Sequence, residues 1–365
     1  MTPSVAEQEG QQTETEATGA PQKHHYTLNQ QVGSITDYAK GIGIILVVFG
    51  HANRGLYSSG IYISPEIYHY LDNVIYSFHM PLFFFLSGLF FVSSIKNRSK
   101  KVFLWSKFKN VIYPYAVWSL IQGGVEVFFS KYTNAKTSIS DVLLFPLYPR
   151  AQFWFLYALF MIFIICAIIY HKKYFLKLLP VFFLVSFVVY VCSGDFGNGF
   201  HFNYVSQNTV FFFLGCMFSK YYQILMKIMS NKSFAVLTCL FVLMEYLYFI
   251  QYGNNYLPLN LYTALIALIS IAWVSNTSIL LSGYNFRWLE NIGKLSLIIY
   301  LVHILAASGT RIILSKIFHV ESWLIHVLLG TFIGVTAPLI FYKLVVRYRL
   351  NFIFEYPSHK KITIV

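Results

Sequence analysis

Two ionisable side chains lie on one face of the first apolar stretch of the chain. Lys40 and His51 are eleven residues apart. At about 100° and about 1.5 Å per residue, this spacing returns to the same helix face and separates the two by roughly 16 Å. The pair suits a long, phosphate-bearing donor that binds at Lys40 and presents its reactive end near His51. The structural alternative is a lysine that reaches the membrane interface and a histidine that only packs between helices.

A second histidine follows in the next apolar stretch. His79 lies in the run from Ser77 to Gly88, and an antiparallel helix would bring it to a depth close to that of His51. Two imidazoles at like depth can orient and deprotonate a hydroxyl, so we count His79 as a catalytic candidate beside His51 and Lys40. A core histidine that makes a single hydrogen bond explains His79 nearly as well.

Several polar and aromatic residues are predicted to gather near the outer ends of the helices. Together they would form a vestibule suited to sugar hydroxyls, and its members are Asp72, Glu126, Arg150, Trp154 and Arg311. For any single one of them, ordinary anchoring at the membrane interface is an equally good explanation.

Four residues are candidates for contact with an anionic donor. Lys107 and Lys109 stand at a membrane boundary, and lysines bind phosphates as point charges, although the positive-inside rule explains most of the charge in this loop. Ser87 and Gly88 are small residues in a helix rich in phenylalanine. Close helix packing explains both, and a backbone approach by the donor is the functional alternative.

Six of these residues, Lys40, His51, His79, Ser87, Gly88 and Trp154, fall in three motifs, Asp37 to His51, Phe78 to Gly88 and Phe153 to Leu156. A fourth motif runs from Gly293 to His303. In these motifs the sequence resembles the acyltransferase-3 family of integral membrane acyltransferases, over about residues 34 to 345.

The resemblance implies transfer of an acyl group, usually acetyl from acetyl-CoA, to a hydroxyl of a bacterial surface polysaccharide or another extracytoplasmic acceptor. It implies that His51 is the catalytic base and Lys40 its basic partner, and we place His303 with the acceptor-binding residues. Many members have arginine at the position of Lys40. Lysine keeps the charge but cannot form a bidentate contact.

The composition determines which elements can position these residues. Of 365 residues, 57% are hydrophobic, 19% aromatic and only 11% charged, whereas soluble domains carry about 25% charged residues. The apolar runs are long and unbroken, which favours helices over the alternating strands of a barrel. We therefore predict an all-α, polytopic transmembrane helix bundle. The net charge of +13 does not indicate nucleic-acid binding, because the basic residues cluster between the apolar segments.

The apolar runs predict about ten spans and three regions. Residues 1–33 have the composition of a disordered cytoplasmic tail, 34–350 form the transmembrane acyltransferase domain, and 351–365 form a cytoplasmic C-terminal tail. Lysine and arginine gather in alternate loops, which places both termini in the cytoplasm. The resemblance implies that the membrane is the bacterial inner (plasma) membrane. The predicted spans lie near 36–56, 70–93, 108–129, 152–170, 174–193, 206–220, 231–251, 256–276, 294–314 and 322–345.

The expected partners follow from this interpretation. They are an acyl-CoA donor, most often acetyl-CoA, a glycan or lipid-linked saccharide acceptor, and membrane lipid. The four cysteines are single and suggest no metal site. Two alternatives stay open: O-succinyl transfer by the same chemistry, and a glycan transporter or flippase, which the lack of a visible inverted repeat disfavours. The oligomeric state is not predicted.

Overall fold

The computed structural model describes residues 28–130, 137–193, 202–252 and 260–357. Within these ranges the chain is all-α and contains no strand, which confirms the predicted fold class. Most of the predicted N-terminal tail and the end of the predicted C-terminal tail lie outside the described residues. The helices are α1 (Leu28–Ser58), α2 (Pro65–Tyr76), α3 (His79–Leu89), α4 (Phe91–Ile95), α5 (Lys100–Lys107), α6 (Tyr113–Phe128), α7 (Ile139–Leu143), α8 (Trp154–Ile169), α9 (Phe175–Cys192), α10 (Phe202–Ser206), α11 (Thr209–Ile228), α12 (Asn231–Tyr252), α13 (Leu261–Tyr284), α14 (Arg287–Lys294), α15 (Ser296–Lys316) and α16 (Trp323–Arg347).

Seven helical segments within the described ranges are long and apolar enough to cross a membrane. Each is at least 18 residues long, close to the roughly 20 that a bilayer core requires. The protein is thus a polytopic membrane protein, whereas the total of ten spans and the cytoplasmic termini stay predictions. The seven segments are Gly33–Ser58, Ala151–Ile169, Phe175–Cys192, Asn231–Tyr252, Leu261–Tyr284, Ser296–Lys316 and Trp323–Arg347.

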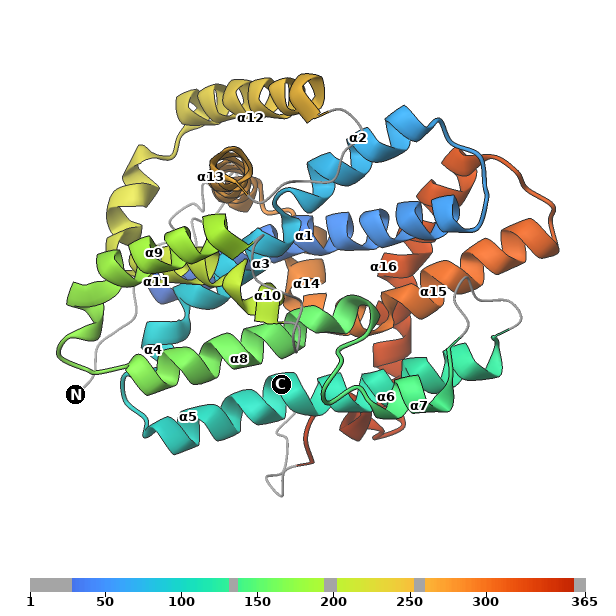
Figure 1. Cartoon of the computed structure of the whole chain (residues 1–365), viewed down its shortest axis with the longest axis horizontal. Helices are drawn as coiled ribbons and strands as arrows, with labels where there is room; N and C mark the ends of the chain where they lie inside the picture. Colours follow the sequence, from blue (N-terminus) through green and yellow to red (C-terminus); the bar gives the residue numbers. More distant parts are fainter. Residues whose placement is uncertain (1–27, 131–136, 194–201, 253–259, 358–365) are drawn as a thin grey trace, which may run out of the picture.

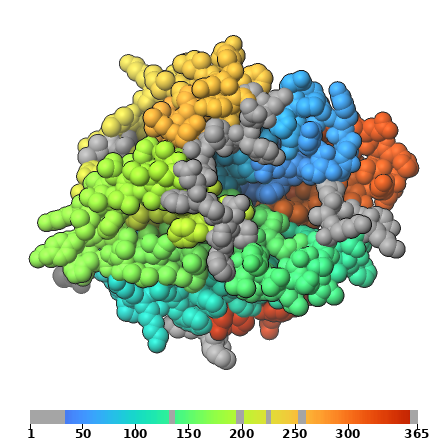
Figure 2. Space-filling model, viewed as in Figure 1, coloured from blue at the N-terminus to red at the C-terminus, as the bar shows by residue number. Residues whose placement is uncertain are grey.

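Helix α1 runs through the middle of the molecule, with α12 and α13 on one side and α5, α6 and α8 on the other (Figure 1). It contacts α2, α3 and α13 to α16, so segments from both halves of the sequence surround it. On the face shown in Figure 2, the blue surface of α1 and α2 lies near the green surface of α8 and α9. Residues carried by α1 can therefore meet residues from most of the chain.

Glycines bring two pairs of helices into backbone contact. A Cβ atom on Gly88 would overlap the carbonyl oxygen of Phe212, and one on Gly215 would overlap that of Phe85, so α3 and α11 meet through reciprocal glycines. Gly293 faces the carbonyl oxygen of Asp37 in the same way, which seats α14 against α1. Small residues at such crossings are the usual way in which membrane helices approach closely.

The predicted second span is a broken helix. The helix is interrupted at Ser77 and Phe78, between α2 and α3; Phe78 leaves helical geometry, and both residues are buried. Irregular backbone at membrane depth is tolerated where protein surrounds it. The break places His79 at the start of α3.

A π-helical turn, Phe108–Ile112, joins α5 to α6 without a gap. Such turns are frequent at functional sites because they rotate the side chains that follow. Here Lys107, Asn110 and Val111 all line one internal cavity.

Candidate active site

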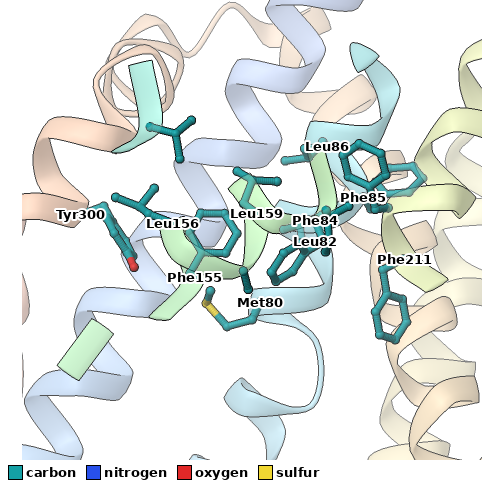
Figure 3. Packing of buried hydrophobic residues seen from close by; sticks show 14 of the residues in the cluster. Met80, Leu82, Phe84, Phe85, Leu86, Phe155, Leu156, Leu159, Phe211 and Tyr300 are labelled. Atoms are coloured by element: carbon teal, nitrogen blue, oxygen red, sulfur yellow. The ribbon is translucent and has the colours of Figure 1, made fainter. Parts of the chain in front are cut away.

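The cavity between α1, α3, α5, α8 and α15 has a volume of about 270 Å³. Its basic lining residues are Lys40 and Lys107, and Ser87 and Ser296 add hydroxyls. The remaining wall is largely apolar and aromatic, with Met80, Phe155 and Leu156 close to Tyr300 (Figure 3). We call this space the inner cavity.

The two lysines of the inner cavity sit in different environments. The ammonium of Lys40 donates to Asp37 Oδ1 at 2.9 Å and lies 5.9 Å from the ring of Phe90. The ammonium of Lys107 lies 4.5 Å from the ring of Phe163. Burial, and secondly the positive charge of Arg98, lower the pKa of Lys107 to about 8.

The other three predicted donor contacts lie in different places. Ser87 lines the inner cavity, and its hydroxyl donates to the carbonyl oxygen of Phe83. Gly88 is turned toward α11 and is not among the residues that line this cavity. Lys109 lies 5.9 Å from the ring of Trp105 and does not line the cavity either.

Three histidines and a tyrosine gather near the last third of α1. The ring of His51 is 5.2 Å from that of His303 and 6.3 Å from that of Tyr76. Tyr76 in turn meets His79 edge to face at 4.5 Å, so its ring contacts both His79 and His51. The structure therefore brings the three histidines of the motifs into one cluster, with His303 closest to His51.

Two of these histidines are held by backbone carbonyls. His79 Nδ1 is 2.6 Å from the carbonyl oxygen of Ile75, and His303 Nδ1 is 2.8 Å from that of Tyr300. A carbonyl only accepts, so Nδ1 carries the proton in both rings, and in the neutral form Nε2 keeps a lone pair. His51 forms no such bond within the described part of the chain, and it lines a second cavity instead.

An ion pair covers the cluster on one side. The guanidinium of Arg54 binds both carboxylate oxygens of Asp72, at 2.6 and 2.7 Å. Its carbon lies 3.2 Å from the centroid of the Tyr76 ring. The bidentate pair fixes the plane of the guanidinium, and the guanidinium in turn fixes Tyr76 beside the histidines. Asp72, predicted to bind acceptor, is thus engaged with Arg54.

The second cavity, which we call the outer cavity, has two lobes. One lobe of about 230 Å³ is lined by His51, Arg54 and His326. The other, of about 750 Å³, is lined by Glu126, Arg150 and an apolar face of α15. Both lobes are lined by Ile304, Ser308 and Arg311, which recur along one face of α15. Three of the predicted acceptor residues, Glu126, Arg150 and Arg311, therefore lie around this space.

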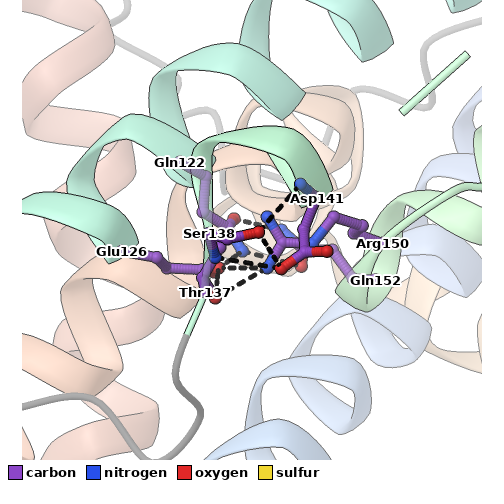
Figure 4. A network of polar contacts seen from close by, with 7 residues as sticks. All are labelled: Gln122, Glu126, Thr137, Ser138, Asp141, Arg150 and Gln152. Carbon is purple, nitrogen blue, oxygen red and sulfur yellow. Dashed lines mark hydrogen bonds and ion pairs between the residues drawn. The ribbon is translucent and has the colours of Figure 1, made fainter. Parts of the chain in front are cut away.

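A polar network connects the outer cavity with the inner one (Figure 4). Arg150 pairs with Glu126 at 2.9 Å, and Glu126 accepts from Gln122, whose amide oxygen accepts from buried Gln152 at 2.7 Å. The Gln152 carbonyl oxygen accepts the hydroxyl of Tyr300, which lines the inner cavity. The network spans the region between the two cavities, which have no lining residue in common.

Trp154 lines a third, smaller cavity of about 150 Å³. Its ring stacks on Tyr204 at 4.7 Å. The cavity carries hydroxyl and amide groups from several helices, and it shares Met80 with the inner cavity. Trp154 is therefore separate from the three acceptor candidates around the outer cavity.

Sequence reasoning missed several residues of this region. Arg54 follows His51 by three residues on α1 and is its helical neighbour, whereas Tyr76 and His79 lie on either side of the break between α2 and α3. Gln122 and Gln152 are buried amides in apolar segments, and burial of an amide was the available signal. Among the described residues, no group of three or more His, Cys, Asp or Glu side chains is placed to hold a metal ion.

Comparison with known proteins identifies the family. Residues 35–343 match the acyltransferase domain of the acyltransferase-3 family, which is most of the chain and includes all four motifs. The chain belongs to the acyltransferase-3 family. As a member of it, this protein is a membrane acyltransferase, which needs an acyl donor and an acceptor.

A curated relative agrees with this assignment. The acyltransferase is similar to nodulation protein NolL of Mesorhizobium japonicum, with 29% identity over 137 residues. The similarity covers 36% of this chain and 35% of that protein, so it spans about a third of the relative's length. No solved structure matches this acyltransferase.

Proposed function

We propose that this membrane acyltransferase is an O-acetyltransferase of the bacterial inner membrane. It moves an acetyl group from acetyl-CoA to a hydroxyl of a cell-surface or lipid-linked glycan. The observation that carries this proposal is the position of the two motif residues on α1. Lys40 lines the inner cavity and His51 lines the outer one, so a single helix presents a cation to one space and an imidazole to the other.

The inner cavity has the chemistry that a CoA thioester needs. Lys40 and Lys107 supply positive charge for phosphates, and the apolar wall accepts the pantetheine arm and the acyl group. Near Tyr300 the wall includes the apolar side chains of Met80, Phe155 and Leu156, which suit the methyl of an acetyl group.

In the proposed reaction, the imidazole of His51 carries out both proton transfers. A nitrogen of His51 accepts the proton of the acceptor hydroxyl while the hydroxyl oxygen forms a bond to the thioester carbonyl carbon. The carbon–sulfur bond then breaks, and the His51 imidazolium returns the proton to the departing CoA thiolate. The products are the acetyl ester and CoA with a free thiol, so charge and protons balance.

The outer cavity suits the glycan. Its larger lobe combines the Glu126–Arg150 pair and Arg311 with apolar residues of α15, a mixture that fits a saccharide attached to a lipid. The competing transporter hypothesis is separated from this proposal by the measurement of glycan export in strains with and without the gene.

Transfer of label from radiolabelled acetyl-CoA to surface glycan, catalysed by the purified protein in nanodiscs, tests the proposal. His51→Ala should abolish transfer, while His171→Ala, which removes an exposed imidazole, should leave it unchanged. A fully active His51→Ala variant would end this mechanism. Mass spectrometry of surface polysaccharide from strains with and without the gene identifies the acyl group and its carrier. If export continues while only the acyl mass disappears, transport is ruled out.

A further inference from the structure

One ring nitrogen of His303 has no hydrogen-bond partner in the described part of the chain. The side chain is fully buried, at 0% exposure, and its Nδ1 donates to the carbonyls of Tyr300 and Ile299, at 2.8 and 3.1 Å. Its Nε2 is shielded from solvent and has no hydrogen-bond partner among the residues that the structure describes. Buried polar atoms in folded proteins nearly always have a hydrogen-bond partner, so a buried acceptor without one calls for an explanation.

The residue that faces His303 is His51. Because a ring nitrogen lies roughly 1.2 Å from its ring centroid, a centroid separation of 5.2 Å allows the two rings to approach to about 2.8 Å between nitrogens. His303 Nδ1 is occupied by its own helix, so Nε2 is the nitrogen that remains for this contact. His51 can therefore donate an N–H to His303 Nε2 after a small ring rotation.

His79 is not equivalent to His303. Its Nδ1 is held in the same way, by the carbonyl of Ile75, but its ring contacts that of Tyr76, whereas the ring of His303 contacts that of His51 directly. His303 also lines none of the three cavities described above, so it does not meet the donor or the acceptor directly. A role in catalysis must then run through His51.

We propose that His303 is the positioning residue of a two-histidine relay, in which its Nε2 accepts the N–H of His51 and fixes the tautomer of that ring. The inference rests on the proposed role of His51. With one nitrogen engaged, the other nitrogen of His51 carries the lone pair and faces the outer cavity, where it accepts the hydroxyl proton. The neutral imidazole of His303 thus accepts the N–H of the catalytic histidine, a role that a carboxylate has in other enzymes.

The first test compares two replacements of His303. His303→Leu keeps an apolar side chain of similar size and removes the acceptor, and should lower kcat about 100-fold while KM for acetyl-CoA and for glycan stays within about twofold. His303→Gln restores an acceptor oxygen at the position of Nε2 and should recover kcat to within about tenfold of the wild type. Ser119→Ala, which removes another buried polar atom without a partner in the described ranges, should leave kcat unchanged.

A second measurement does not depend on turnover. Solid-state ¹⁵N NMR of histidine-labelled protein should show a single tautomer for His51 in the wild type and in His303→Gln, and two tautomers in His303→Leu. An unchanged kcat in His303→Leu, or a His51 spectrum that is the same in all three proteins, would overturn the inference. If the wild type transfers no acyl group, the proposed function fails while the spectra still decide on the relay.

Discussion

The contribution of Lys107 to donor binding can be tested directly, because this side chain is expected to lose its positive charge within an accessible pH range. Its ammonium lies above the rings of Phe163 and Phe103, at 4.5 and 5.4 Å from their centroids, and it lines the inner cavity. Burial, followed by repulsion from Arg98, lowers the pKa of Lys107 to about 8. A lowered lysine pKa means that the positive charge is present below pH 8 and is lost as the pH rises through that value.

The size of the effect follows from this pKa. With a pKa of about 8, the charged fraction of Lys107 falls from about ten-elevenths at pH 7 to about one-eleventh at pH 9. If the charged form binds the donor phosphates, the affinity should fall about tenfold over this interval, which equals about 1.4 kcal/mol. Calorimetry with a thioether analogue of acetyl-CoA, which cannot be hydrolysed at high pH, measures this change in nanodiscs.

Two variants separate Lys107 from other groups that titrate in the same range. Lys107→Arg keeps the charge throughout the interval, so its affinity should vary less than about twofold between pH 7 and pH 9. Lys107→Met should bind weakly and equally at both values. A tenfold pH dependence that persists in Lys107→Arg would refute the assignment and locate the titrating group elsewhere.

Two further predictions concern the frame of the site. Gly88→Ala should destabilise the protein by about 1–3 kcal/mol, because the new Cβ meets the backbone of α11. Gly124→Ala should leave the stability unchanged, because no atom lies near its Cβ position. Thermal unfolding in detergent measures both variants. Asp72→Asn should also destabilise the protein by about 1–3 kcal/mol and raise KM for the glycan, because Arg54 loses its charged partner beside Tyr76. An unchanged melting temperature and an unchanged KM would show that the ion pair is not needed.

The sequence predicted the helical class and the alignment of Lys40 with His51 for a clear reason. Both depend on periodicity along a single segment, and an ionisable residue in an apolar helix is visible without any knowledge of its neighbours. The positions of Glu126, Arg150 and Arg311 around one cavity are a different matter. They come from α6, from the segment before α8 and from α15, and only the packing of these helices determines whether they meet.

The sequence pattern also could not predict the local breaks in the helices. The second predicted span was continuous in hydropathy, yet the chain bends at Ser77 and Phe78, and the π-helical turn at Phe108–Ile112 has no compositional signature. Both irregularities lie beside the site. His79 begins α3 directly after the first, and Asn110 within the second lines the same cavity as Lys107.

The separation of the two cavities defines what the catalytic cycle has to accomplish. Ile44 lines the inner cavity and His51 the outer one, and seven residues of helix place roughly 10 Å between them. Tyr300 stands at the inner cavity and His303, one helical turn later, at His51. In the proposed reaction, the thioester carbonyl must therefore move beyond the inner cavity to meet the imidazole. Tyr300 lines that cavity and its hydroxyl donates to the backbone carbonyl of Gln152, so this side chain joins the proposed donor space to the polar network around Glu126.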